Sequence, residues 1–210
     1  MSGGRLFVIA APSGAGKTSL VKALLARQTN LRVCVSHTTR PQRPTEVDGR
    51  DYHFVSVERF ESLIAADGFL EYARVFDNYY GTSRSALQEA FGRGHDVILE
   101  IDWQGAAQVR ERAHNPHTGQ GCIGVFVLPP SRDELERRLR SRRTDSDAVI
   151  ERRLRDAVDD MRHYREFDYV IVNADFETAL TELEQILAGD ATALRAQRPE
   201  LAPLLAELLI

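Results

Sequence analysis

The chain alternates between short apolar runs and segments whose apolar residues follow helical spacing. Strand-like apolar runs occupy residues 6–10, 97–102, 123–128 and 169–173. Runs of this length without strict polar alternation indicate strands that are buried on both faces of a sheet. Helical spacing is seen at 19–26, 106–113 and 176–187. Strands that alternate with helices predict an α/β fold in which a parallel sheet is flanked by helices.

Two segments are too polar to belong to that core, residues 36–83 and residues 131–158. In the first, Pro41 and Pro44 exclude a long helix. Its pattern predicts three short elements: a helix at 57–66, a strand at 71–76 and a turn at 79–82. The second is charged and helical, with an interruption at 144–146. We therefore expect one domain with two excursions from its core.

The last residues form a tail with an apolar stripe at helical spacing. The stripe follows Pro199 and consists of Leu201, Leu204, Leu205, Leu208 and Leu209. Two interpretations stay open. The tail is either a helix that docks on the rest of the chain or a surface through which the chain forms a homo-oligomer.

Composition and charge exclude several classes of protein. The 210 residues suit one globular domain, and 43% hydrophobic with 28% charged residues argue against disorder. A net charge of −4 argues against general nucleic-acid or membrane binding. Two cysteines, Cys34 and Cys122, are too few for a domain of this size to be stabilised mainly by disulfides. With no signal-peptide pattern and no apolar run of about 20 residues, we expect a cytoplasmic protein.

A glycine-containing loop lies between the first predicted strand and the first predicted helix. Its sequence is Ala11-Pro12-Ser13-Gly14-Ala15-Gly16-Lys17-Thr18, which matches the phosphate-binding pattern G-x-x-x-x-G-K-[ST] except at Ala11. Backbone N–H groups and the helix N-terminus would surround phosphate, with Lys17 on the outer phosphates and Thr18 on Mg²⁺. Lys17 is one of only two lysines among 27 basic residues, which favours a position where an ammonium group is wanted. The alternative is a chance glycine-rich turn.

Acidic residues end the second predicted strand. Glu100 and Asp102 are two apart and therefore share one face of the strand. An acid that follows a buried strand beside a phosphate loop suits Mg²⁺ binding. The alternative is a solvated strand end.

The polar excursion carries two arginines in a proline-stiffened segment. Guanidinium groups such as those of Arg40 and Arg43 bind phosphate in bidentate fashion. Tyr52 and Tyr80 could add phenolic donors, and Glu71 could accept from two adjacent N–H groups of a base, which adenine does not offer. Taken alone, a solvated loop with ordinary surface arginines is the simpler interpretation.

Together these motifs resemble guanylate kinase, particularly the bacterial enzymes, in ordered matches from about residue 5 to residue 187. The matching segments are 11–18, 35–41, 43–44, 49–52, 69–71, 78–82, 100–105, 129–131 and 170–173. The resemblance implies MgATP-dependent transfer of the γ-phosphoryl group to GMP, and also to dGMP, giving ADP and GDP. It implies the fold of a P-loop nucleoside monophosphate kinase, with no nucleic-acid or membrane partner. Its parts would be a core (5–35, 84–130 and 159–189), a GMP-binding lobe (36–83), a mobile lid (131–158) and a helical tail (190–210).

The resemblance also implies roles for individual residues. The GMP site would contain Ser36, Arg40, Arg43, Tyr52, Glu71, Tyr80, Gly81, Thr82 and Glu100. Among these, Glu71 would accept hydrogen bonds from guanine N1–H and the N2 amino group. Residues 11–18 and Asn173 would bind ATP, and Thr18 and Asp102 would hold the metal. The groups around the transferring phosphoryl would be Lys17, Arg40, Arg138, Arg142 and Arg153.

Some positions depart from the family pattern. Glu100 stands where Asp is commoner, Arg143 where Gly is usual, and Ala174 where Asp is usual. Two other functions stay open: a ribose 1,5-bisphosphate phosphokinase, and a non-catalytic guanylate-kinase-like interaction domain. Glu71 together with Ser36 and Thr82 favours GMP over the ribose compound, and the intact phosphate loop favours an enzyme. For the arginine-rich segment 131–158, a salt-bridged solvated helix is the alternative to a catalytic lid.

Overall fold

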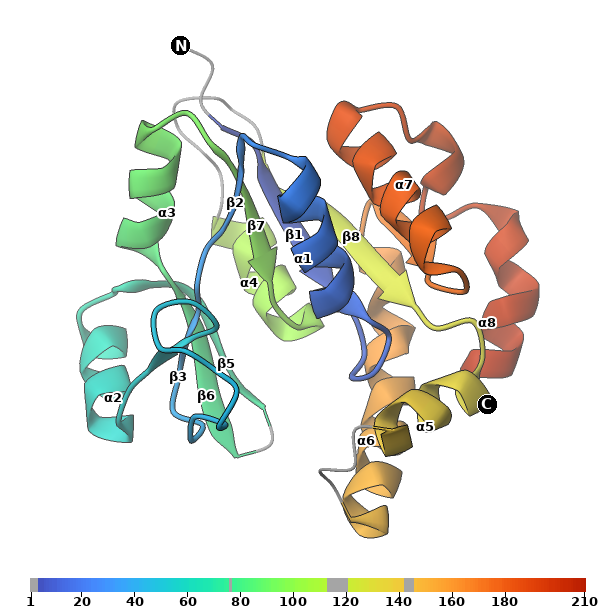
Figure 1. Ribbon diagram of the computed structural model, residues 1–210, viewed down its shortest axis with the longest axis horizontal. Coiled ribbons are helices and arrows are strands. Elements are labelled where there is room, and N and C mark those ends of the chain that lie inside the picture. The colour runs from blue at the N-terminus through green and yellow to red at the C-terminus, as the bar shows by residue number, and fades with distance from the viewer. Residues whose placement is uncertain (1–3, 76, 113–120, 142–145) are drawn as a thin grey trace. The chain divides into compact units, whose positions relative to one another are not determined.

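The computed structural model describes residues 4–75, 77–112, 121–141 and 146–210, which fall into two compact units. Unit 1 contains the described residues of 1–8 and 30–123, and unit 2 contains those of 9–29 and 124–210. Strand β1 (Leu6–Ala10) is fully buried and begins in unit 1 and ends in unit 2. Figure 1 labels helices α1–α8 and strands β1–β3 and β5–β8.

In unit 1, the core strands run in the order β2-β7-β1. Strand β2 (Leu31–Val33), which sequence patterns did not predict, pairs in parallel with β7 (Asp96–Glu100). The Asp96 carboxylate accepts from the Arg5 backbone N–H at 2.7 Å and from its guanidinium at 2.6 Å. This pair fixes the chain before β1 to the start of β7. Helix α3 (Arg84–Gly92) leads into β7 and is capped by Ser83, whose side chain accepts from Ala86 N–H.

A second sheet in unit 1 has the order β4-β3-β6-β5. Its strands are β3 (His37–Thr38), β4 (His53–Phe54), β5 (Phe69–Val75) and β6 (Asn78–Ser83). The predicted turn at 79–82 is wrong, because these residues form β6 and pair with both β5 and β3. Tyr79 stacks on Phe60 with ring centroids 5.2 Å apart. This packing against α2 (Val57–Ala65) favours an extended strand over the turn that a Tyr-Tyr-Gly-Thr sequence suggests.

In unit 2, β8 (Ile123–Leu128) and β9 (Tyr169–Val172) continue the sheet in parallel, in the order β1-β8-β9. Helix α1 (Lys17–Arg27) contacts α7 (Phe176–Ala188). Arg27 donates to Glu177 at 2.7 Å across this helix pair. The predicted α/β fold with a parallel sheet and flanking helices is confirmed.

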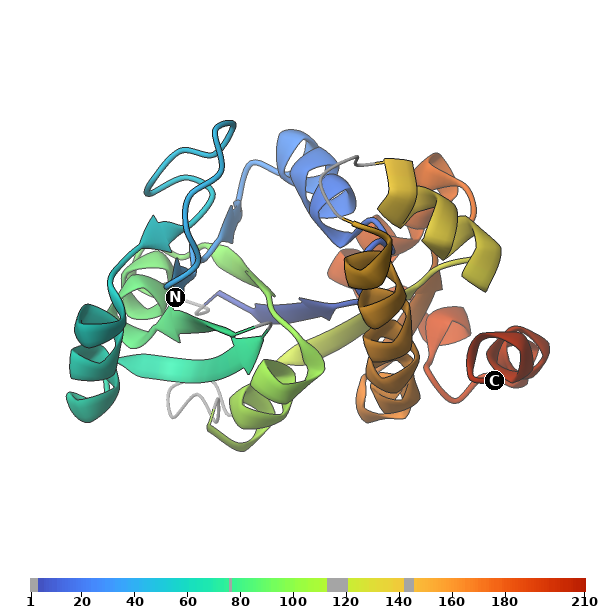
Figure 2. The same ribbon diagram turned by 90° about the horizontal axis from the view of Figure 1, so that it is seen from below.

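The arginine-rich segment of unit 2 forms two helices, α5 (Arg132–Ser141) and α6 (Asp147–Arg162), followed by the short helix η1 (His163–Glu166). Helices α5 and α6 lie side by side (Figure 2). Leu135, Leu139 and Ile150 bury their side chains between them. This small apolar cluster makes the helix pair a packed element with its own core.

The tail docks on unit 2. It forms η2 (Thr192–Leu194), η3 (Pro199–Leu201) and α8 (Ala202–Leu208). Leu201, Leu205 and Leu208 of the apolar stripe are buried, so the docking interpretation is confirmed for these side chains. Arg198 Nη1 donates to the Val170 carbonyl at 2.8 Å, which ties the tail to β9. Homo-oligomer formation through the tail stays a prediction.

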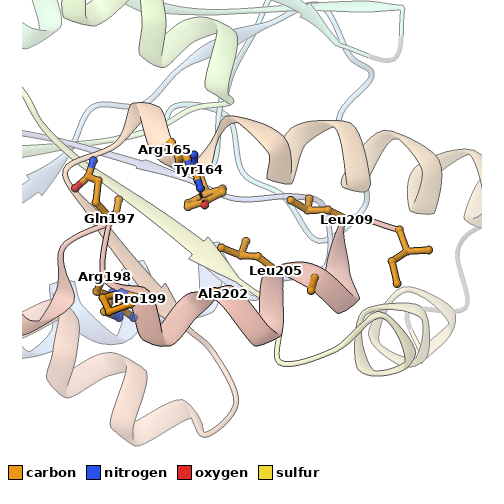
Figure 3. Close-up of a pocket in the computed structure, with 11 residues that line it drawn as sticks. Tyr164, Arg165, Gln197, Arg198, Pro199, Ala202, Leu205 and Leu209 are labelled. Carbon is orange, nitrogen blue, oxygen red and sulfur yellow. Dashed lines mark hydrogen bonds between the residues drawn. The ribbon is translucent and has the colours of Figure 1, made fainter.

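A groove of about 700 Å³ remains beside the docked tail (Figure 3). The groove is lined by Leu205 and Leu209 from the tail and by Tyr164 and Arg165 from η1. The Arg165 guanidinium donates to the Tyr164 hydroxyl at 2.7 Å, and Arg198 is held by backbone carbonyls. The basic groups at the groove are therefore engaged within the chain.

Among the helices of the described residues, none is both long and apolar enough to cross a membrane.

Replacing Leu208 by Ala should destabilise the chain by about 2 to 5 kcal/mol, because a fully buried leucine leaves a cavity. Ile210→Ala is the matched control, since Ile210 is 84% exposed, and it should change stability by less than about 0.5 kcal/mol. Urea unfolding measures both variants. Equal stability of the two variants would contradict the docked position of α8.

Candidate active site

The phosphate loop leaves β1 and enters α1 with a backbone that requires glycine at two places. Gly14 and Gly16 have φ of 95° and 96°, in the left-handed region. A Cβ on Gly16 would lie 2.3 Å from Asn173 Nδ2, so space as well as backbone angle excludes a side chain there. Ala11 does not have a positive φ, so alanine is tolerated at the first position of the motif. Lys17 and Thr18 are the first residues of α1, where the N–H groups of the first turn and the helix dipole favour an anion.

Two residues far along the chain brace this loop by sharing one carbonyl oxygen. Asn173 Nδ2 donates to the Ala15 carbonyl at 2.7 Å, and Arg138 Nη1 donates to the same oxygen at 3.3 Å. Arg138 Nη2 also donates to the Asn173 carbonyl at 3.0 Å. Asn173 is 4% exposed. The structure thus brings predicted ATP-site residues together, with the Asn173 amide on the loop backbone; its contact with adenine stays a prediction.

The helices α5 and α6 carry two of the predicted lid arginines, Arg138 and Arg153. The Arg138 guanidinium donates to Glu134 at 2.7 Å, and Arg137 donates to the same carboxylate. Hydrogen bonds from Arg137 and Arg138 lower the pKa of Glu134 to about 2. Other arginines of these helices pair with neighbouring acids, as in Arg140 with Glu136, which agrees with a salt-bridged helix surface. Arg153 lies on α6, whereas Arg142 and the unusual Arg143 lie outside the described residues.

In unit 1, the predicted base-reading residues meet in a buried position. Glu71 on β5 is 2% exposed and Thr82 on β6 is fully buried. Their strands place them opposite each other, and Thr82 Oγ1 donates to Glu71 Oε1 at 2.5 Å. Burial, followed by the negative charge of Glu71, raises the pKa of Cys34 to about 12, so this thiol is not a nucleophile.

The predicted phosphate-binding residues of unit 1 also cluster. The Arg40 guanidinium lies 5.4 Å from the centre of the Tyr52 ring, and Tyr52 packs edge-on against Tyr80 at 5.9 Å. Burial, then the neighbouring Tyr80 and Glu100, raise the pKa of Tyr52 to about 12, so its hydroxyl remains a hydrogen-bond donor. Arg43 is half-exposed at its side chain, with Nη1 3.9 Å from Glu46.

Glu46 is a site residue that sequence patterns missed. It accepts from Arg40 Nη2 at 2.7 Å and from the Arg43 backbone N–H at 2.8 Å. Burial acts to raise the pKa of Glu46, but these two hydrogen bonds and the charges of both arginines outweigh it and leave the pKa below its ordinary value. An acid in a polar loop gives no signal that separates it from a surface residue.

The remaining GMP-site predictions lie at defined places in unit 1. Gly81 of β6 packs under two aromatic rings, because a Cβ there would lie 3.0 Å from Phe60 and 3.1 Å from Phe69. The Ser36 carbonyl accepts from His53 N–H at 2.9 Å. Glu100 ends β7, and Asp102 caps the next helix by accepting from Gly105 N–H at 2.7 Å.

Comparison with known proteins decides the family. The model of the guanylate kinase family matches residues 3–190. The chain belongs to the guanylate kinase family. The expected resemblance, and with it the class of nucleoside monophosphate kinases, is therefore confirmed.

Individual members of the guanylate kinase family match beyond the family model. A guanylate kinase of Methylococcus capsulatus is 54% identical over 209 residues and covers 100% of both chains. One of Alkalilimnicola ehrlichii is 54% identical over 206 residues, 98% of each chain. The crystal structure of guanylate kinase from Anaplasma phagocytophilum has a TM-score of 0.73 at 32% identity, and the match covers 100% of this chain and 97% of that one. These alignments include the tail as well as the family domain.

Asn173→Ala should weaken ATP binding about tenfold, because the buried Ala15 carbonyl loses a hydrogen bond worth roughly 1 to 3 kcal/mol and the loop loosens. Titration with tripolyphosphate, which has no base, should show the same loss. Asn30→Ala, a change at an asparagine of unit 1, is the control. Weaker ATP binding with unchanged tripolyphosphate binding would contradict the bracing role and indicate an adenine contact.

Proposed function

We propose that this chain transfers the γ-phosphoryl group of MgATP to GMP, giving ADP and GDP, and that dGMP is accepted as well. The observation that carries the proposal is the buried Glu71–Thr82 pair in a chain that also has an intact phosphate loop. The first supplies recognition of guanine and the second supplies recognition of a nucleoside triphosphate. Neither alternative function requires both.

The donor half of the site is built in unit 2. The N-terminus of α1 and the backbone of residues 11–16 would surround the β- and γ-phosphates, and Lys17 would reach the outer phosphates. Asn173 and Arg138 hold the loop through Ala15, so its N–H groups need no reorganisation when ATP binds. Preorganised dipoles of this kind stabilise the charge that develops on the transferring group.

Mg²⁺ is implied by the family, and oxygen ligands are present for it. The Thr18 hydroxyl would bind the ion directly, and Asp102 would contact it or its water molecules. Within the described part of the chain, no group of three or more metal-binding side chains occurs. Mg²⁺ does not require such a group, because it typically takes most of its ligands from phosphate and water. When bound, the ion neutralises charge on the phosphate oxygens.

The acceptor half of the site is built in unit 1. Glu71, held by Thr82, would accept from guanine N1–H and from the N2 amino group, while Ser36 and Thr82 would contact the base. Adenine has an acceptor at N1 and no amino group at C2, so a buried carboxylate rejects it. Arg40, Arg43, Tyr52 and Tyr80 would hold the GMP phosphate, with Gly81 and Glu100 beside them.

The reaction needs no protein nucleophile. An oxygen of the GMP phosphate attacks the γ-phosphorus as the bond to the β–γ bridging oxygen breaks, and ADP carries away the electron pair. Arg138, Arg142 and Arg153 would neutralise the equatorial oxygens, together with Lys17 and Arg40. We assign the GMP lobe to 36–83, the lid to 131–158, the core to 5–35, 84–130 and 159–189, and the helical tail to 190–210. Closure of the lid would exclude water and so suppress ATP hydrolysis.

We also propose a cytoplasmic location. The reaction uses ATP, and the cysteines of the described chain, Cys34 and Cys122, are free thiols. No nucleic-acid partner is proposed, since the net charge is −4.

ADP formation from MgATP tests the proposal, with GMP, AMP, CMP, UMP or ribose 1,5-bisphosphate offered separately. We expect turnover with GMP and little response to the others. Lys17→Met should lower kcat by at least about 10³-fold, because the transition state loses the charge that offsets the outer phosphates, while its unfolding curve stays that of the wild type. Turnover only with the ribose compound, or no turnover with GMP still bound, would move the function to one of the two alternatives.

Glu71→Gln tests base recognition directly. A glutamine amide loses the negative charge that both guanine donors share, so kcat/KM for GMP should fall about 100-fold. The ratio of kcat/KM for GMP to that for AMP should fall with it. Glu61→Gln, on the exposed side of α2, is the control and should change neither quantity. An unchanged GMP:AMP ratio in Glu71→Gln would refute the assigned role.

A further inference from the structure

Helix α4 (Trp103–Arg112) covers the outer edge of β5, the strand that carries Glu71. Strand β5 is the last strand of its sheet, and α4 packs against it. The Gln108 side chain accepts from the Tyr72 backbone N–H at 3.2 Å and donates to the Tyr72 carbonyl at 2.7 Å, as a neighbouring strand would. Arg112 donates to the Leu70 carbonyl at 3.3 Å. The helix is therefore bound to the backbone on both sides of Glu71.

The first turn of α4 brings Gly105 against the Glu71 carboxylate. Asp102 caps this turn by accepting from Gly105 N–H at 2.7 Å. A Cβ on Gly105 would lie 2.6 Å from Glu71 Oε2 and 3.2 Å from Glu71 Cδ. Both distances are shorter than ordinary van der Waals contact. The carboxylate thus occupies the volume that any side chain at position 105 would need.

Neither the backbone nor helix propensity accounts for a glycine at this position. Gly105 does not belong to the glycines with positive φ, so its backbone angles suit any residue. A glycine inside a helix costs about 1 kcal/mol relative to alanine. The feature that requires glycine is the space taken by Glu71. A flexible carboxylate could move aside, but Glu71 is 2% exposed and its other oxygen is held by Thr82 at 2.5 Å.

We propose that Gly105 is a positioning residue for guanine recognition: it provides the space in which the Glu71 carboxylate sits, while Gln108 fixes α4 at the distance that keeps this space. The inference rests on the proposed function, in which Glu71 reads the guanine. Gly105 touches no substrate in this scheme and acts through Glu71. A Cβ on Gly105 would also lie 3.3 Å from Asp102 Oδ1, which is a longer approach than either distance to Glu71.

Gly105→Ala should raise KM for GMP by about 10- to 100-fold, because a displacement of a recognition group by about 1 Å has effects of this size. The kcat at saturating GMP and KM for ATP should stay within about threefold of wild type, since the phosphate loop and Lys17 are unchanged. Selectivity for GMP over IMP, which lacks the N2 amino group, should fall in parallel. Gly92→Ala is the matched control, because this glycine also lies in a helix and a Cβ there meets nothing within 4 Å.

A double-mutant cycle shows whether Gly105 acts through Glu71. GMP affinities of the wild type, Gly105→Ala, Glu71→Ala and the double variant are measured by calorimetric titration, which needs no turnover. With the carboxylate removed, the added methyl group has space, so Gly105→Ala should weaken GMP binding less than about twofold in the Glu71→Ala background. Equal penalties in both backgrounds would overturn the proposal, as would wild-type GMP affinity in Gly105→Ala.

If Gly105→Ala does not fold, Gln108→Ala supplies the same test with no added volume. It removes both bonds to Tyr72, and we expect KM for GMP to rise several-fold at unchanged kcat. Unchanged KM for GMP and an unchanged GMP:IMP ratio in Gln108→Ala would then reject the proposal. The wild type, assayed alongside, distinguishes these outcomes from failure of the proposed function, which would appear as absent GMP-dependent turnover before any variant is compared.

Discussion

Burial of the Glu71 carboxylate is the constraint on which much of unit 1 depends. A charged group that is 2% exposed is costly unless its lone pairs are satisfied. Thr82 supplies one hydrogen bond, and this bond requires the antiparallel register of β5 and β6. The other side of the carboxylate requires the absence of a side chain at Gly105. In the proposed function, a guanine edge would donate to this buried carboxylate, and selectivity would follow because adenine offers it an acceptor instead of a donor.

In unit 2, side chains satisfy a buried backbone carbonyl, that of Ala15, in a similar way. The Ala15 carbonyl lies inside the phosphate loop, where the N–H groups turn toward the anion and the oxygens must find other partners. Asn173 and Arg138 provide them, one from the end of β9 and one from α5. Because Arg138 also belongs to the arginine-rich helices, the position of α5 and the shape of the loop are mechanically linked within this unit. In the proposed function, substitutions at Asn173 would therefore affect the binding of the phosphates as well as that of the base.

The sequence predicts the elements whose signals are local. Buried strands such as β8 are continuous apolar runs, and the phosphate loop depends on Gly14, Gly16 and Lys17 at fixed spacing. The strand β6 could not be predicted, because Tyr79 is extended only through its stacking on Phe60, a contact between distant residues. The role of Glu46 could not be predicted for the same reason, since its hydrogen bonds to Arg40 and Arg43 exist only in the folded chain. Membership of a family supplies roles for matched positions, but the residues that hold those positions in place emerge from the contacts.

Two arginines of the proposed mechanism already have a carboxylate partner. Arg40 is bound to Glu46 at 2.7 Å, and Arg138 is bound to Glu134 at 2.7 Å. The pairs keep the guanidinium groups extended and oriented, which lowers the entropy lost when phosphate arrives. A phosphate would also have to compete with the paired carboxylate for each guanidinium group. The free energy gained on binding would then be the difference between the two interactions. An isolated small anion gains little from this exchange. A nucleotide would gain more, because its base would be bound elsewhere at the same time, and the paired arginines would therefore favour complete substrates over free phosphate.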